Sequence, residues 1–147
     1  MKPFIYLIFC ICLSLISCKP SEEKSTATGQ RAYRTEQVSL GKSIYTQNCL
    51  ECHGTQAQGE PNWKTPLADG RFPAPPLNGT GHAWHHPLAD LIQTVKQGSQ
   101  SQGGRMPAFE KKLSESEIEQ VLAYIQSLWS DDIYKIWQEK VNVSATS

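Results

Sequence analysis

The 147-residue sequence has few cysteines and methionines, and it has no excess of charge of either sign. Three of the five cysteines fall within the first 18 residues, so the rest of the chain contains only Cys49 and Cys52. A zinc site would need a second pair of Cys or His ligands. With 14 basic and 14 acidic residues, the chain lacks the cationic surplus of a nucleic-acid-binding protein. Zinc fingers and nucleic-acid partners are therefore disfavoured.

The two remaining cysteines lie in the segment Cys49-Leu50-Glu51-Cys52-His53, which has the C-x-x-C-H pattern of covalent c-type haem attachment. Two intervening residues make one helical turn, so both thiols can reach the vinyl groups of one porphyrin, and His53 follows on the same side. A thioredoxin-like redox pair is typical of a βαβ unit, whereas an amphipathic helical stretch precedes this motif. A structural disulfide would leave His53 unexplained. The motif therefore predicts one covalent haem with His53 as an iron ligand.

The first 17 residues are predicted to form a removable export signal. Lys2 gives a positive start, and residues 4–16 are almost entirely apolar but too short to span a bilayer comfortably. An uncleaved membrane anchor is the alternative. The last four residues of this region, Leu-Ile-Ser-Cys at 15–18, resemble the lipobox of bacterial lipoproteins. The resemblance implies cleavage before Cys18, acylation of Cys18, and an exported, lipid-anchored protein on the periplasmic side or the cell surface.

The rest of the chain is predicted to form one domain with tails. Residues 19–37 are polar and have no apolar period, which indicates a flexible tether, or alternatively coil packed on the domain. The end of the chain has a short amphipathic patch whose role the sequence does not decide. The predicted segments are a signal peptide at 1–17, a tether at 18–37, a domain at 38–129 and a C-terminal tail at 130–147.

Within the domain, apolar residues recur at helical spacing in three segments, 38–48, 87–97 and 113–129. Ser114 and Glu117 fit a capping box at the start of the last helix, and Gly98 fits the end of the second. Gly41 lies inside the first helix, where a glycine lowers helix propensity unless another helix approaches closely.

Gly41 to Tyr45, followed by the haem motif, resembles the opening of a class I cytochrome c domain. The resemblance covers about residues 38–129. It implies a small all-α fold of three or more helices wrapped around one covalently bound haem, with the first helix crossing the last at the glycine. In the same family a Pro-x-Leu segment follows the motif, and Pro75-Pro76-Leu77 is similar to it. This implies that the Pro75 carbonyl accepts a hydrogen bond from Nδ1 of His53 and that Leu77 packs on the haem; a plain proline-rich turn is the alternative.

Met106 is the only methionine after Met1, and it lies in the segment Met-Pro-Ala-Phe. This segment resembles the distal Met-Pro loop of the same family. Electron-transfer cytochromes commonly pair a histidine on one side of the iron with a methionine on the other. The resemblance therefore implies Met106 as the second axial ligand, with ordinary packing as the alternative.

Three histidines, His82, His85 and His86, occur within five residues. They could bind copper or zinc, because imidazole suits both metals. One of them could instead compete for the iron, or all three could be polar residues at the surface.

A haem iron with His and Met ligands has no open position for a substrate, and Met ligation raises its reduction potential. We therefore expect a membrane-tethered carrier of single electrons between redox proteins such as an oxidase, a reductase or a dehydrogenase. One alternative is a haem enzyme, or a subunit of one, in which the Met bond breaks. The other is a copper-handling protein that uses His82, His85 and His86.

Overall fold

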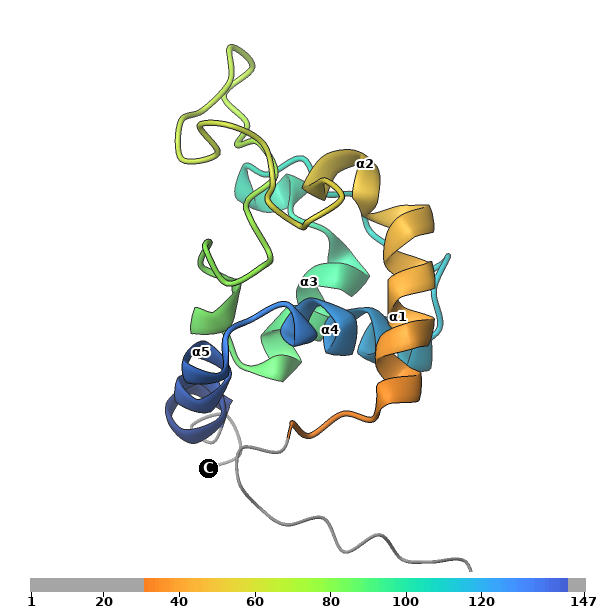
Figure 1. Cartoon of the computed structure of the whole chain (residues 1–147). Helices are drawn as coiled ribbons and strands as arrows, with labels where there is room; N and C mark the ends of the chain where they lie inside the picture. Colours follow the sequence, from red (N-terminus) through yellow and green to blue (C-terminus); the bar gives the residue numbers. More distant parts are fainter. Residues whose placement is uncertain (1–30, 143–147) are drawn as a thin grey trace, which may run out of the picture.

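The computed structural model describes residues 31–142 (Figure 1). The predicted signal peptide, Cys18 and most of the predicted tether lie outside these residues. The described part is built from helices and loops without a strand, which confirms the expected all-α class. None of its helices has the length and apolar character needed to cross a membrane. The elements are α1 (Thr35–Asn48), α2 (Leu50–His53), η1 (Ala83–His85), α3 (Leu88–Gln97), η2 (Gln100–Gln102), α4 (Glu115–Ser127), α5 (Asp131–Ile136) and the π-helical η3 (Trp137–Asn142).

The central helix, α4, begins at the predicted capping box. Ser114 Oγ accepts a hydrogen bond from the Glu117 backbone N–H (3.3 Å), and the Glu117 carboxylate accepts one from the Ser114 N–H (2.8 Å). These bonds satisfy backbone donors that the first turn of a helix leaves unpaired. The buried side of the helix contributes more of the hydrophobic core than any other described helix, through residues that include Ile118, Val121, Leu122 and Ile125.

Helix α1 crosses α4 at Gly41, as the resemblance implied (Figure 1). Gly41 is buried, and a Cβ atom at this position would collide with the main-chain carbonyl of Gln120 on α4. One turn later, Tyr45 is 1% exposed and its ring lies 5.2 Å from that of Tyr124, centroid to centroid. The close crossing holds the C-terminal end of α1, from which the haem motif continues, against the core.

The second predicted helix, at 87–97, corresponds to α3 and its boundaries are nearly correct. The sequence suggested Pro87 as the first helical residue, whereas in the structure Pro87 is the N-cap. At the other end Gly98 has φ = 72°, a conformation that glycine adopts without strain, and it ends the helix as predicted.

The folded domain extends beyond both predicted boundaries. Helix α1 begins at Thr35, three residues before the predicted start, and Arg31 donates hydrogen bonds to the carbonyls of Gln126 and Trp129 (both 2.7 Å). The Gln126 carbonyl is in the last turn of α4 and the Trp129 carbonyl follows directly after the helix, where backbone acceptors lack intrahelical partners or share weak ones. Part of the segment predicted as tether is therefore fixed to the domain.

The residues predicted as a C-terminal tail form α5 and η3. Tyr134 and Trp137 are each 3% exposed, and the Trp137 indole N–H donates to the His86 carbonyl (2.8 Å). The Trp137 ring also packs edge-on against Trp129, with 5.7 Å between centroids. Through Tyr134 and Trp137, α5 and η3 are packed against the core.

Candidate functional site

The haem motif occupies the short helix α2, directly after α1. The backbone N–H groups of Cys52 and His53 both donate to the Cys49 carbonyl (3.2 and 2.9 Å), which winds the segment into one turn. Cys49 is half-buried, Cys52 is exposed, and neither thiol is in a disulfide. The structure therefore brings both thiols and His53 together on one turn.

A hydrogen bond from Tyr45 fixes the end of the α2 turn. Its hydroxyl donates to the Gly54 carbonyl (2.7 Å), and the Gly59 N–H donates to the His53 carbonyl (2.8 Å). Gly54 has φ = 79°, so the chain leaves α2 through a conformation that favours glycine. The sequence argument did not identify the Tyr45 hydroxyl as part of the site.

His53 is 8% exposed, and its Nδ1 lies 3.0 Å from the Pro75 carbonyl oxygen. A carbonyl only accepts hydrogen bonds, so Nδ1 carries the proton and the lone pair is on Nε2. Burial lowers the pKa of His53, which the bond to Pro75 and the nearby Glu60 only partly oppose. The imidazole is thus neutral at neutral pH, in the form and tautomer that bind a metal through Nε2.

The register of the Pro75 loop is set by a series of backbone hydrogen bonds. The Glu60 N–H donates to the Ala74 carbonyl (2.9 Å), and the Leu77 N–H donates to the Ala57 carbonyl (2.8 Å). Glu60 also accepts from the Ala74 N–H through its carboxylate (3.1 Å). These bonds flank Pro75 on both sides. They direct the carbonyl of Pro75, and not that of Pro73 or Pro76, toward His53.

Met106 is half-buried and packs against the hydrophobic core, as do Leu77 and Cys49. Its N–H donates to Ser99 Oγ (3.2 Å), and its carbonyl accepts from the Ser99 N–H (3.0 Å). The Met106 carbonyl also lies so close to Gly98 that a Cβ there would clash with it. The end of α3 thus holds the Met106 loop in one position.

A salt bridge links the two loops of the site. Arg105, next to Met106, lies 3.4 Å from Glu60, the residue that fixes Ala74 in the other loop. This pair was not found from the sequence, because the two residues are 45 positions apart and no local pattern relates them.

The cysteines differ electrostatically from reactive thiolates. Burial, followed by the neighbouring Cys52 thiol, raises the pKa of Cys49 to about 11, and Lys112 opposes this only in part. No group of three or more His, Cys, Asp or Glu residues among the described residues could hold a metal ion, and this part of the chain has no strand, so the structure gives no support to the zinc and thioredoxin-like interpretations of the motif.

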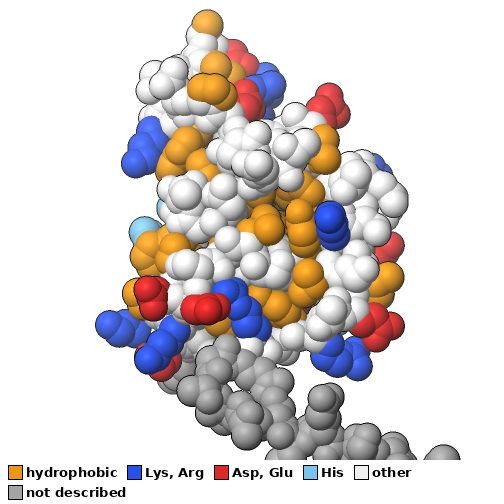
Figure 2. Space-filling view, viewed as in Figure 1, with side chains coloured by type: hydrophobic (Ala, Val, Ile, Leu, Met, Phe, Trp, Pro, Cys, Tyr) orange, Lys and Arg blue, Asp and Glu red, His pale blue; other side chains and the backbone are white. Residues whose placement is uncertain are grey.

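The residues fit a haem. The site offers a buried neutral imidazole whose Nε2 makes no hydrogen bond within residues 31–142, and two unpaired thiols one turn away. Hydrophobic side chains gather in the middle of the face shown in Figure 2, where a flat apolar porphyrin could pack. Cys49, Leu77 and Met106 contribute to the same apolar surroundings.

The three histidines do not form a metal site. All three are exposed, and no group of three or more His, Cys, Asp or Glu residues within the described chain could hold a metal ion. The His82 ring stacks on Trp63 (5.4 Å between centroids), whereas the His85 ring lies against Trp84 (4.0 Å). The structure therefore gives no support to the interpretation of His82, His85 and His86 as a copper or zinc cluster.

Comparison with known proteins agrees with this geometry. A family model described as "Cytochrome C oxidase, cbb3-type, subunit III" matches residues 36–125. The "Cbb3-type cytochrome c oxidase subunit CcoP" of Azospirillum sp. (strain B510) is 36% identical over 93 residues, which are 62% of this chain and 28% of that protein. The "Cbb3-type cytochrome c oxidase subunit FixP" of Sinorhizobium medicae (strain WSM419) is 29% identical over 97 residues, 62% of this chain and 30% of that protein. The chain thus spans less than a third of these relatives.

A solved structure has a similar fold. Cytochrome CL from the marine methylotrophic bacterium Methylophaga aminisulfidivorans MPT superposes with a TM-score of 0.54 over 82% of this chain and 78% of that chain. The sequences are 23% identical, so this likeness concerns the fold.

Proposed function

The chain belongs to the cytochrome c family of cbb3-type subunit III domains, and we propose that it is a monohaem c-type cytochrome that carries single electrons between redox proteins. Membership in the family implies that it binds haem c. The observation that carries the proposal is the orientation of His53, whose Nδ1 donates to Pro75 and whose Nε2 remains available one turn after two unpaired thiols.

In this proposal each site residue has one task. Cys49 and Cys52 would hold the porphyrin through thioether bonds, and His53 would bind the iron through Nε2. The Pro75 carbonyl fixes the tautomer of His53 and increases its basicity, while Leu77 would pack on the ring. Met106 would supply the second iron ligand. The haem, when bound, supplies one-electron chemistry at its iron.

Electron transfer is favoured over catalysis by the way the Met106 loop is held. Two hydrogen bonds to Ser99 and the close packing on Gly98 restrain the loop from opening. A haem enzyme that binds a small molecule at the iron would need that loop to move. The names of the relatives make an oxidase the best-supported partner.

We further propose that Cys18 carries a lipid that anchors the domain to a membrane. The support is the lipobox-like sequence at 15–18, which lies outside the described residues, together with the use of every other cysteine after it for haem. Mass spectrometry of the mature protein should find an acylated Cys18 as the first residue. A mature terminus with an unmodified Cys18 would contradict the anchor.

Acid–acetone extraction tests the haem assignment. The haem should remain on the polypeptide in the wild type. It should also remain in the control Cys18→Ser, because this substitution leaves both attachment thiols in place. Cys49→Ala and Cys52→Ala should each lose covalent haem in part, and the double variant should lose it completely. Haem that extracts freely from the wild type would overturn the proposal.

A further inference from the structure

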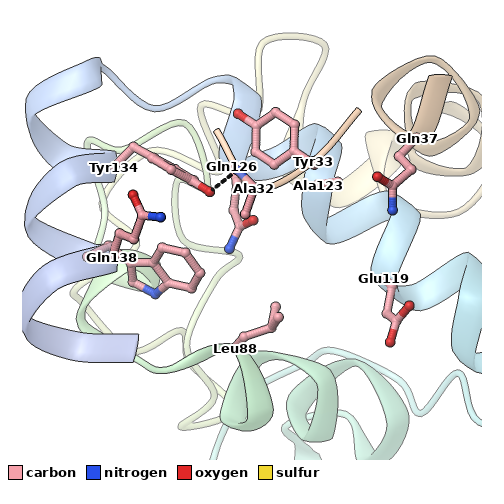
Figure 3. Close-up of a pocket in the computed structure, with 10 residues that line it drawn as sticks. Ala32, Tyr33, Gln37, Leu88, Glu119, Ala123, Gln126, Tyr134 and Gln138 are labelled. Carbon is pink, nitrogen blue, oxygen red and sulfur yellow. Dashed lines mark hydrogen bonds between the residues drawn. The ribbon is translucent and has the colours of Figure 1, made fainter. Parts of the chain in front are cut away.

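A cavity lies away from the haem motif, between α4, the start of α1 and η3 (Figure 3). Its volume is about 310 Å³, at the small end of the range for ligand-binding pockets. Its walls combine aromatic rings from Tyr33, Tyr134 and Trp137 with aliphatic surface from Leu88 and Ala123.

The cavity contains a buried polar group without a partner among the described residues. Gln126 is 5% exposed, and its Nε2 makes no hydrogen bond to any part of the described chain. Figure 3 shows this amide directed into the open space above Leu88, with Tyr134 on one side and Glu119 on the other. Burying an amide N–H without an acceptor costs free energy, so a ligand that brings an acceptor gains a bond that the protein has left unmade.

The lining also defines the charge and shape of such a ligand. Among the described residues that line the cavity, only Glu119 is charged. The Arg31 guanidinium lies against the lining residues Tyr33, Gln126 and Tyr134 and balances that charge, so the site favours a neutral ligand. The aromatic and aliphatic walls favour a flat apolar body. The volume admits about one ring with a short substituent.

We propose that this cavity binds a small neutral molecule in which a single planar ring carries a carbonyl oxygen. The ring packs among Trp137, Tyr134 and Leu88, and the carbonyl accepts a hydrogen bond from Nε2 of Gln126. No bond is made or broken in the ligand, and the site acts independently of the haem ligands.

Two probes of nearly identical shape separate the hydrogen bond from simple burial. Acetophenone has the carbonyl, and ethylbenzene does not. Each is titrated into the reduced, ¹⁵N-labelled full chain, while the side-chain amide of Gln126 and the indole N–H of Trp137 are followed by NMR. We expect both signals to shift with acetophenone, which should bind roughly 3- to 10-fold more tightly than ethylbenzene, as one neutral hydrogen bond allows.

Gln126→Met keeps the side-chain volume but removes the donor, so it should bring the two affinities together. Gln93→Met, on the exposed side of α3, is the matched control and should keep the wild-type difference. The proposal is overturned if acetophenone leaves the Gln126 signal unchanged, or if the wild type binds both probes equally and water alone satisfies the amide. Because the wild-type comparison needs no variant, it decides the question even if Gln126→Met fails to fold, and a negative result leaves the haem assignment intact.

Discussion

The indole N–H of Trp129 donates a hydrogen bond to the Leu77 carbonyl (2.8 Å), joining the end of α4 to the loop that carries Pro75. Trp129 is 2% exposed, and the Leu77 N–H is itself bound to the Ala57 carbonyl. The peptide groups around Leu77 are therefore paired on both sides, and the position of the Pro75 carbonyl over His53 depends on a residue 52 positions along the chain from Leu77.

Trp129→Phe should lower the free energy of unfolding by about 1–3 kcal/mol, because it leaves the Leu77 carbonyl without its buried donor. Trp137→Phe is the matched control. It removes an equivalent bond to the carbonyl of His86, but His86 is exposed and water can replace the donor, so the loss should be smaller. Guanidinium unfolding of both variants measures the difference. Equal losses would mean that the Leu77 bond has no special role.

Gly41→Ala should destabilise the domain although alanine is the better helix former by about 1 kcal/mol. The new Cβ would lie 2.6 Å from the Gln120 carbonyl carbon, a backbone atom that cannot rotate away, so α1 and α4 must separate. Overpacking of this kind costs about 1–3 kcal/mol before the helix preference is subtracted. Ser43→Ala, on the exposed side of the same helix, should change stability by less than about 0.5 kcal/mol. A stabilised Gly41→Ala protein would contradict the close crossing.

Arg31→Ala should cost about 1–3 kcal/mol, since two carbonyls at the end of α4 lose a charged donor. Arg71→Ala removes an exposed pair with Asp69 and should cost less than about 1 kcal/mol. Thermal unfolding of the two variants gives the comparison. An Arg31 variant as stable as the Arg71 variant would show that the segment before α1 is not anchored in solution.

Acid should weaken the domain through His82. His82 is exposed as a residue, but one side of its ring is covered by Trp63. This partial burial, then His86, His85 and Lys64, lowers the pKa of His82 below its ordinary value, so the unfolded chain takes up this proton first. The contribution of His82 to the free energy of unfolding is complete above about pH 6.5, the pKa of histidine in the unfolded chain. It falls as the pH drops below that value and stops falling below the pKa of His82 in the folded protein. His82→Phe retains a ring against Trp63 without a titrating nitrogen. Its melting temperature should fall less between pH 7.5 and pH 5.5 than that of the wild type, and an identical fall would contradict this assignment.

The sequence predicts the features that depend on neighbouring residues. The capping box at Ser114 and the helix end at Gly98 follow from local backbone chemistry, and the structure has both. The close helix crossing at Gly41, which the structure also has, was implied by the resemblance to cytochromes c. The all-α fold follows from helical periodicity and from the resemblance to cytochromes c.

Features that join distant segments were not predicted. The sequence after residue 130 shows a short amphipathic patch of Ile133, Ile136 and Trp137. The structure buries Trp137 but leaves Ile136 40% exposed, and it buries Tyr134, which is not in the patch. The change from α5 to the π-helical η3 at Trp137 alters which side chains share a face. Arg31 gave no signal because its partners, the carbonyls at the end of α4, are backbone atoms about 100 residues away.

The most direct test of the electron-carrier account is the visible spectrum of the oxidised protein, which reports whether Met106 binds the iron. The wild type should show the weak long-wavelength band of a sulfur-to-iron bond, and His85→Ala should retain it. Met106→Leu should lose the band, and Met106→His should give a folded, red protein with a clearly lower reduction potential, since axial ligands tune haem over roughly 0.8 V. A wild type without the band, or a band that survives in Met106→Leu and disappears in His85→Ala, would contradict the account.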